Sequence, residues 1–293
     1  MRDFSGKTAF ITGGASGIGL GIARALLDRG TNVVIADLLQ DHLDDAAARL
    51  GTRATHFIRL DVSDRAAMAA AAAETRRIFG PVHILCNNVG VSQRNPIDEA
   101  SYEDWDYVLG VNIGGTVNGL VSFLPDMKAH GEGGHVVNTS SMAGMIPVPA
   151  FAGIYATSKF AVRGMADALR LALGPYRIGV SVLCPGMTRT RAMTAGDLYR
   201  QSHFGKSGAG ERRDPILHGM DPDELGQRVA EAIERNQPYI FPHGEFRDEV
   251  AAYFNEMLTA FPTEYEIDPE RRTGEERRAR MTAEARRIAD AIH

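Results

Sequence analysis

The sequence predicts one α/β domain, a doubly wound parallel sheet of about seven strands, followed by a C-terminal helical extension. Two observations predict this fold. Short apolar runs alternate with longer stretches of helical periodicity, and a glycine-rich turn joins the first run to the first helical stretch. The length of 293 residues and the apolar content of 44% suit one large core. The expected strands cover about 7 to 12, 32 to 37, 54 to 60, 82 to 86, 134 to 140, 178 to 184 and 238 to 241.

The first expected strand leads into a turn with glycines at positions 13, 17 and 19, and the pattern of a helix follows. Glycine lets a backbone turn sharply and approach a ligand closely. The start of the helix offers free N–H groups and a positive dipole end, which suit a pyrophosphate. A glycine-rich turn can also be only a turn, but this context favours a dinucleotide site.

The second expected strand ends in Asp37, eighteen residues after Gly19. A carboxylate there can accept hydrogen bonds from both ribose hydroxyls, and it repels a 2′-phosphate. The segment Thr12 to Gly19 contains no Lys or Arg, and neither do the three positions after Asp37. The sequence therefore predicts NAD, rather than NADP, as the cofactor.

The later elements follow the same alternation. An Ala-rich stretch, Ala66 to Ala73, has the propensity of a helix and is predicted to be one rather than a linker. Two cysteines, Cys86 and Cys184, each end an apolar run, and we predict buried, reduced thiols.

A phenol and an ammonium group share one face of a predicted helix, because Tyr155 and Lys159 are four residues apart. A nearby cation favours the phenolate, and this would let a tyrosine act as a general base near neutral pH. The spacing alone is also common on solvated helices, so the pair gains weight only from its context.

Together these motifs resemble the short-chain dehydrogenase/reductase family, over about Phe4 to Phe241. The turn matches the family pattern T-G-x-x-x-G-x-G, and Tyr155 and Lys159 match Y-x-x-x-K. The resemblance implies a Rossmann fold and four catalytic residues, Asn112, Ser141, Tyr155 and Lys159. Together with the turn and Asp37, it implies this cofactor-binding set: Thr12, Gly13, Ser16, Gly17, Ile18, Gly19, Asp37, Asp61, Val62, Asn88, Gly90, Tyr155, Lys159, Pro185, Gly186, Thr188 and Thr190.

Two positions depart from the family pattern. Ser141 lies fourteen residues before Tyr155, one more than is usual, so either Ser141 or Ser140 can face the substrate. Val89 replaces the alanine of the family's N-N-A-G motif, which is expected to crowd the cofactor cleft slightly.

The implied reaction interconverts a secondary alcohol and a ketone. Tyr155 would exchange the hydroxyl proton, and a bound nicotinamide would exchange the hydride. Lys159 would lower the pKa of the phenol, and Ser141 would hold the substrate oxygen. Asn112 is expected to lie in a helix and to position a water that relays protons from Lys159. Two alternatives stay open: an NAD(P)H-dependent carbonyl reductase, and a non-catalytic NAD-binding regulatory module.

Apolar side chains in three variable segments favour a bulky apolar or aromatic substrate. Alternatively, these side chains only pack the loops onto the domain. They are Val91, Met142, Met145, Ile146, Val148, Phe151, Met187, Met193, Leu198, Tyr199 and Phe204. Arg94, Arg189 and Arg191 are either solvated or recognise a substrate carboxylate. The polar, Gly-rich stretch 201–214 within the substrate loop 187–220 is expected to be a mobile lid.

Composition limits the remaining possibilities. A net charge of −5 makes nucleic acid an unfavourable partner, and the His and Cys spacings do not indicate a metal site. The sequence shows no run of about 20 apolar residues and no signal peptide at its start, so we expect a cytoplasmic protein that does not bind membranes.

We expect a dehydrogenase domain over residues 1–262 and a charged helix or tail over 263–293. Phe246 to Phe261 is amphipathic and is predicted to pack at a subunit interface or over the active site. The family resemblance also implies a homodimer or homotetramer. The C-terminal extension and the Met-Arg-Asp-Phe start resemble bacterial family members that oxidise benzylic alcohols in lignin-derived aryl ethers.

Overall fold

A computed structural model describes residues 1, 3–92, 95–190 and 218–292 of the chain. Within these residues, seven parallel strands form one sheet in the order β3-β2-β1-β4-β5-β6-β7. The strands are β1 Thr8–Thr12, β2 Asn32–Asp37, β3 Thr55–Arg59, β4 Ile84–Asn87, β5 Gly134–Thr139, β6 Ile178–Leu183 and β7 Tyr239–Ile240. The predicted fold class and all seven predicted strands are confirmed, and β7 is the one that is clearly shorter than its apolar run.

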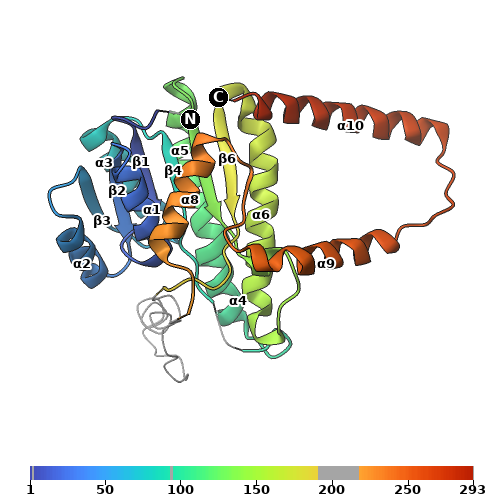
Figure 1. The fold of residues 1–293 in the computed structure, drawn as a ribbon, viewed down its shortest axis with the longest axis horizontal. Coiled ribbons are helices and arrows are strands. Elements are labelled where there is room, and N and C mark those ends of the chain that lie inside the picture. Colours follow the sequence, from blue (N-terminus) through green and yellow to red (C-terminus); the bar gives the residue numbers. More distant parts are fainter. Residues whose placement is uncertain (2, 93–94, 191–217, 293) are drawn as a thin grey trace.

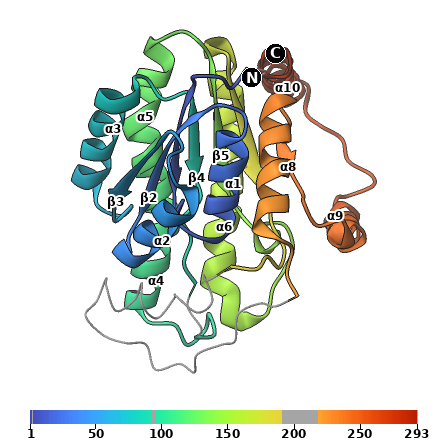
Figure 2. The same ribbon diagram turned by 60° about the vertical axis from the view of Figure 1, so that its left-hand side comes forward.

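Helices cover both faces of the sheet (Figures 1 and 2). The first face carries α1 Gly17–Leu27, α2 Gln40–Leu50 and α8 Pro222–Glu234. The second face carries α3 Arg65–Phe79, α4 Tyr102–Leu109, α5 Gly115–Ala129 and α6 Gly153–Leu173. The Ala-rich stretch lies in α3, as predicted, and the Asp64 carboxylate caps this helix by accepting the N–H groups of Ala66 and Ala67.

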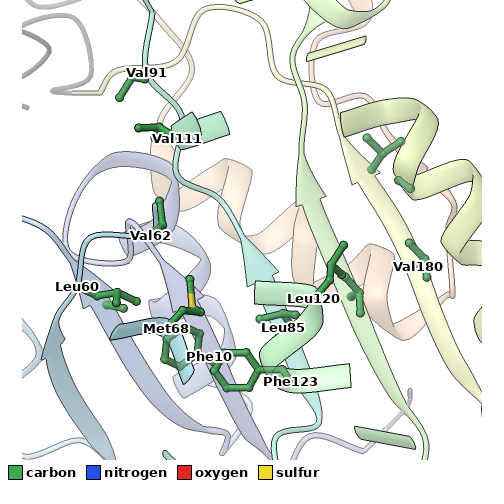
Figure 3. Packing of buried hydrophobic residues seen from close by; sticks show 14 of the residues in the cluster. Phe10, Leu60, Val62, Met68, Leu85, Val91, Val111, Leu120, Phe123 and Val180 are labelled. Carbon is green, nitrogen blue, oxygen red and sulfur yellow. The ribbon is translucent and has the colours of Figure 1, made fainter. Parts of the chain in front are cut away.

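The core has two layers because each central strand is buried on both sides. In β1, Ala9 and Ile11 belong to the layer under α1 and α8, whereas Phe10 belongs to the layer under α3 and α5. Figure 3 shows Phe10 beside Phe123 of α5, and their ring centroids are 4.4 Å apart. Strands buried on both faces read as continuous apolar runs, which explains why the sequence pattern located them.

The strand order reverses between β1 and β4, so that the chain leaves these two neighbours in opposite directions along the sheet. The helices that follow β1 and β4 cover opposite faces. A crevice therefore opens beyond the carboxyl ends of these strands, where ligands bind in folds of this kind.

One continuous helical segment, Tyr102–Ala129, consists of α4, a π-helical turn η1 (Gly110–Gly114) and α5. Its length of 28 residues and its apolar composition would allow it to cross a membrane, but 56% of its most apolar window is buried within the domain. Core helices pass the same test. The segment therefore gives little support to a membrane role, and the absence of membrane binding stays a prediction.

His135 in β5 gives the fold a dependence on acid. Burial lowers the pKa of His135 to about 3. The Ser181 hydroxyl donates to the carbonyl of Gln237, so the His135 Nε2–H donates to Ser181 Oγ at 2.8 Å. In the unfolded chain the imidazole binds a proton near pH 6.5, so between about pH 6.5 and pH 3 the unfolded state holds the extra proton.

We therefore expect the free energy of unfolding to fall as the pH is lowered through this window. His135 alone accounts for about 1.4 kcal/mol per pH unit well below pH 6.5. Urea unfolding at a series of pH values measures the slope, and His135→Gln, which keeps an N–H donor, should flatten it. An unchanged slope in this variant would show that other groups cause the acid sensitivity.

The C-terminal part forms two further helices, α9 Arg247–Thr259 and α10 Pro269–Asp290. Val250, Tyr253 and Phe254 of α9 pack against the domain, whereas Leu258 is exposed. Helix α10 is exposed along most of its length and packs only near its end, where Ala289 is buried. Both helices extend away from the body of the molecule on the side of α6 (Figure 1). The proposed division at residue 262 stays a prediction.

Candidate active site

A cleft of about 760 Å³ lies beyond the carboxyl ends of the central strands. Its lining includes most of the predicted site residues, which come from all parts of the chain. They are Gly13, Ser16, Gly17, Ile18, Asp37, Asp61, Val62, Asn88, Gly90, Ser141, Tyr155, Lys159, Pro185, Gly186, Thr188 and Thr190. The other three predicted residues, Thr12, Gly19 and Asn112, lie behind the lining and support it.

The glycine turn has a shape that larger residues would break. A Cβ atom on Gly19 would lie 2.1 Å from the carbonyl oxygen of Gly13, and Gly17 has a φ of +49°. Helix α1 begins at Gly17, so its first N–H groups and its dipole point toward the cleft. This cradle fits a pyrophosphate.

Thr12 joins this turn to the segment after β4. Its hydroxyl donates to the carbonyl of Cys86 at 3.4 Å and accepts the backbone N–H of Asn88 at 2.9 Å. Asn88 in turn donates to the carbonyl of Thr12 and accepts the hydroxyl of Thr139. The predicted residue Thr12 therefore positions the two walls of the cleft against each other.

Asp37 ends β2 inside the cleft and is 3% exposed. Its Oδ1 accepts the N–H of Leu39 at 3.3 Å and lies 3.8 Å from His42 Nδ1. Its Oδ2 is buried and accepts no hydrogen bond from the described residues. Burial raises the pKa of Asp37, against the opposing effect of nearby backbone N–H groups and His42. Two ribose hydroxyls would give this carboxylate the donors that it lacks, so the residue fits the predicted cofactor.

Asp61 and Val62 line the adjoining part of the cleft. Asp61 Oδ1 accepts the backbone N–H and the hydroxyl of Ser63 at 2.9 and 2.7 Å. The carbonyl of Val62 accepts the side-chain amide of Asn118 at 2.9 Å. These bonds fix the segment after β3, and the implied role of Asp61 in cofactor binding stays a prediction.

Tyr155 and Lys159 lie on successive turns of α6, and the Lys159 Nζ is 5.5 Å from the centroid of the Tyr155 ring. Lys159 is buried and donates to the carbonyl of Thr139 at 2.9 Å. Burial lowers the pKa of Lys159 to about 8. The predicted pair is therefore assembled at the cleft.

The protein surroundings alone do not lower the pKa of the Tyr155 phenol. Burial raises the pKa of Tyr155, and the hydrogen bond with Ser141 opposes this effect. A protonated Lys159 favours the phenolate, but burial also lowers the pKa of Lys159. The expected lowering of the phenol pKa with a cofactor bound stays a prediction.

The structure shows which of the two serines lies beside Tyr155. The buried Ser140 hydroxyl donates to the carbonyl of Lys159 at 2.7 Å, which directs it away from Tyr155. The Ser141 hydroxyl lies close enough to Tyr155 to oppose the rise of its pKa, donates to the carbonyl of Pro185 at 3.5 Å and accepts the N–H of Ala143 at 3.1 Å. Ser141 is therefore the residue beside the phenol.

Asn112 lies in the π-helical turn η1, inside a helical segment as expected. Its side-chain oxygen accepts the N–H of Val91 at 2.8 Å, and its amide group donates to Val91 O and to the Ser158 hydroxyl. The side chain thus ties the segment after β4 to α6. The proton relay through a water stays a prediction.

Gly90 explains how Lys159 reaches its place. A Cβ atom at position 90 would lie 2.8 Å from Lys159 Nζ, so a larger residue would push the ammonium group away from Thr139. The neighbouring Val89 lines the cleft, and a Cβ on Gly13 would lie 3.2 Å from its Cγ2. The expected crowding of the cofactor cleft by Val89 stays a prediction.

His243 is a site residue that the sequence reasoning missed. Its Nδ1 accepts the N–H of Gly186 at 3.0 Å, and its Nε2 donates to the carbonyl of Met187 at 3.0 Å. The same carbonyl accepts the N–H of Met220, which joins the two ends of the substrate loop. His243 is buried and therefore clamps the Pro185 to Thr188 wall of the cleft from behind.

We expect His243→Phe to keep the fold but to weaken cofactor binding, because the Gly186 N–H loses its acceptor and the Met187 carbonyl loses one of its two donors. Each lost bond to a buried backbone group costs about 1–3 kcal/mol. We predict a KM for the cofactor at least about tenfold higher than in the wild type. Steady-state kinetics measures it, and His243→Asn, which can keep the acceptor at the Nδ1 position, should recover part of the loss. Equal losses in both variants would contradict a positioning role.

The substrate end of the cleft is apolar, as predicted. Val91, Met142, Ile146, Val148, Phe151 and Met187 line it, and the missed residues include Tyr107, Val111 and Phe246. Met145 does not line the cleft, because its side chain packs into the core. Arg189 forms an ion pair with Asp221, so it is not directed at a substrate carboxylate. Arg94, Arg191, Met193, Leu198, Tyr199, Phe204 and the expected lid over 201–214 lie outside the described residues.

A cluster of His83, His130 and Glu132 lies at the opposite ends of the strands, with its ligand atoms within 4.8 Å of one another. Backbone N–H groups bond to both Nδ1 atoms, and Glu132 Oε2 pairs with Lys7 at 2.5 Å. This cluster is already hydrogen-bonded, so it gives no support to a metal site. The absence of a metal stays a prediction. Cys86 and Cys184 are free and buried, as predicted.

Comparison with known proteins agrees with this geometry. The family model of the short chain dehydrogenases matches residues 7–198. A C alpha-dehydrogenase of Sphingobium sp. strain SYK-6 is 37% identical over 280 residues, which cover 92% of this chain and 91% of that protein.

Two solved structures extend the comparison. LigO from Sphingobium sp. strain SYK-6, in its apo form, is 39% identical with a TM-score of 0.78, over 96% of this chain and 98% of that chain. A short chain dehydrogenase/reductase from Burkholderia phymatum in complex with NAD is 28% identical with a TM-score of 0.82, over 92% and 100% of the two chains. The cleft, the catalytic constellation and these matches agree, and this chain belongs to the short-chain dehydrogenase family of oxidoreductases.

Proposed function

We propose that this protein is an NAD-dependent oxidoreductase that interconverts a secondary alcohol and a ketone, with Tyr155 as the acid/base. One observation carries the proposal. The side chains of Tyr155 and Ser141 lie next to each other where the polar cofactor half of the cleft meets its apolar half. An alcohol oxygen bound between these hydroxyls would contact both a proton acceptor and a donor.

The proposed preference for NAD over NADP rests on Asp37. Its buried Oδ2 needs donors, and a 2′-phosphate would bring a second negative charge into a cavity that already penalises one. The relative from Burkholderia phymatum, which was solved with NAD, supports the same choice.

In the oxidation direction, bound NAD supplies the hydride acceptor and a positive charge. Tyr155 takes the proton of the substrate hydroxyl, and Ser141 donates to the substrate oxygen. Lys159 is held against Thr139 and can keep its proton only near or below its lowered pKa of about 8. The side chains of Tyr155, Ser141 and Lys159 are held in place by their neighbours. These neighbours are Ser140, Gly90 and Asn112.

The substrate is proposed to be a bulky aromatic alcohol. Aromatic and flexible apolar side chains line that end of the cleft, including Tyr107, Met142, Phe151 and Phe246. The similarity to a C alpha-dehydrogenase and the C-terminal extension favour a benzylic alcohol of an aryl ether.

The decisive experiment incubates the protein with NAD and a panel of benzylic, alicyclic and short aliphatic secondary alcohols, and follows the reduced nicotinamide by its absorbance. We expect turnover with benzylic alcohols, and slow turnover with short aliphatic ones. Reduction of ketones with a strong preference for the phosphorylated cofactor would replace the proposal by a carbonyl reductase. NAD binding without turnover in either direction would indicate a regulatory module.

We also propose a homodimer or homotetramer in the cytoplasm. Helix α5 exposes Val117 and Val121 beside an apolar hollow that Leu120, Leu124 and Pro125 help to line, and such faces favour association. The buried thiols Cys86 and Cys184 suit a reducing compartment. Sedimentation and cell fractionation test these two points.

A further inference from the structure

The two C-terminal helices form an arm, residues 247–290, that contacts the domain only near its two ends. At the first end, Phe254 of α9 packs with Arg163, whose guanidinium carbon is 5.7 Å from the ring centroid. At the second end, Asn236 donates to the carbonyl of Ala289 at 2.9 Å, and Arg170 pairs with Asp290. Both Arg163 and Arg170 belong to α6, so this helix carries both anchors.

Between the anchors the arm stands away from the domain. Figure 1 shows α9 and α10 leaving the domain near the two ends of α6. In Figure 2 both helices are seen almost end-on at the side of the domain. This part of the arm exposes large apolar side chains: Leu258 64%, Phe261 70%, Tyr265 63% and Met281 65%. A helix without tertiary packing is marginal in water, so this arrangement calls for a partner surface.

The exposed face of α6 is smooth. Thr157, Ala161, Gly164, Ala168 and Ala172 are all exposed and follow one another at helical spacing. A Cβ atom on Gly164 would meet no described atom within 4 Å. Small side chains along a helix allow a second helix to approach closely.

The charges of the arm indicate that its partner is a second copy of this chain. Residues 247–268, the acidic limb, carry six carboxylates and one arginine, whereas α10 carries seven arginines and five carboxylates. In two copies related by a twofold axis, the acidic limb of each can lie across α10 of the other. Each copy thus supplies an acidic limb, a basic α10 and an exposed α6 face for contact with the other copy.

We propose that the arm clasps a second copy of this chain, whose α6 enters the space between α9 and α10 while the acidic limb of each copy contacts α10 of the other. The proposal goes beyond the catalytic function and beyond association through α5. It concerns assembly, so it can fail while the enzyme activity is confirmed, and the reverse also holds.

Charge reversal in the full chain tests it. The first variant carries Arg272→Glu and Arg277→Glu on α10, and the second carries Glu264→Arg and Glu266→Arg in the acidic limb. Sedimentation at low salt should show self-association at least about tenfold weaker in each variant than in the wild type. An equimolar mixture of the two should associate as tightly as the wild type, because each reversed surface then meets an opposite charge.

The control is Arg49→Glu on α2, which lies on the other face of the sheet and should leave association unchanged. Circular dichroism checks that the variants keep their helices. A monomeric wild-type protein, association of the two variants at wild-type strength, or failure of the mixture to recover would each overturn the proposal. Association with an unrelated partner only would also overturn it.

Discussion

Replacing Tyr155 with phenylalanine is expected to lower kcat for alcohol oxidation by about 10²- to 10⁴-fold and to leave NAD affinity nearly unchanged. The variant removes the one hydroxyl that faces both Ser141 and the apolar end of the cleft. It keeps the aromatic ring, which lies near the buried Lys159 ammonium group. Steady-state kinetics gives kcat, and titration of the intrinsic fluorescence gives the affinity for NAD.

The two neighbouring serines provide the matched control. Ser141→Ala removes the partner of Tyr155 and should slow turnover by about 10²-fold or more. Ser140→Ala removes a bond to the carbonyl of Lys159 and should reduce stability by about 1 kcal/mol with a much smaller effect on turnover. Tyr155→Phe with wild-type turnover would remove the basis of the proposed mechanism. Equal loss of turnover in the two serine variants would reassign the substrate-facing hydroxyl.

The pKa values of Tyr155 and Lys159 depend on burial as well as on the distance between the two side chains. Burial raises the pKa of Tyr155 and lowers that of Lys159, so it disfavours the charged form of each residue. The positive charge of an oxidised nicotinamide is the further charge that would favour the phenolate. The sequence showed that the phenol and the amine are neighbours, but only burial shows which of the two opposing effects prevails.

Most of the fold could be predicted because its elements are encoded locally. The central strands are buried on both faces, so each of them appears as an apolar run whatever its neighbours are. The glycine turn and the carboxylate of Asp37 sit at strand ends, where the fold assembles its ligand sites. These residues could therefore be placed in one cleft without coordinates.

The missed residues act across long distances in the sequence. His243 contacts Gly186 and Met187 over more than fifty positions, and Phe246 reaches the cleft from the start of α9. Nothing in the local pattern around His243 indicates its partners. The arm was equally hidden, since an amphipathic helix and a charged helix each have a satisfactory local explanation, and only their common attachment to α6 raises the question of a partner.

Replacing Asp37 with asparagine is expected to raise the KM for NAD by about 10²-fold and to leave kcat at saturation much less affected. The carboxylate is the group placed to accept both ribose hydroxyls, and a hydrogen bond to a charged group contributes about 1.5–3 kcal/mol. An asparagine keeps one acceptor but presents a donor where Oδ2 lies buried without a partner. Because burial already penalises the charge of Asp37, the variant should be at least as stable as the wild type.

The cofactor preference separates this role from general damage to the cleft. In the wild type the carboxylate repels a 2′-phosphate, so Asp37→Asn should raise activity with NADP relative to NAD, as measured by the ratio of kcat/KM values. Asp41→Asn, an exposed carboxylate in the first turn of α2, is the matched control and should change neither value. A wild-type enzyme that already prefers NADP, or a variant with an unchanged ratio, would show that Asp37 does not select the cofactor. The buried and under-bonded carboxylate would then need another explanation, because a fold stabilised mainly by apolar contacts gains nothing from that charge alone.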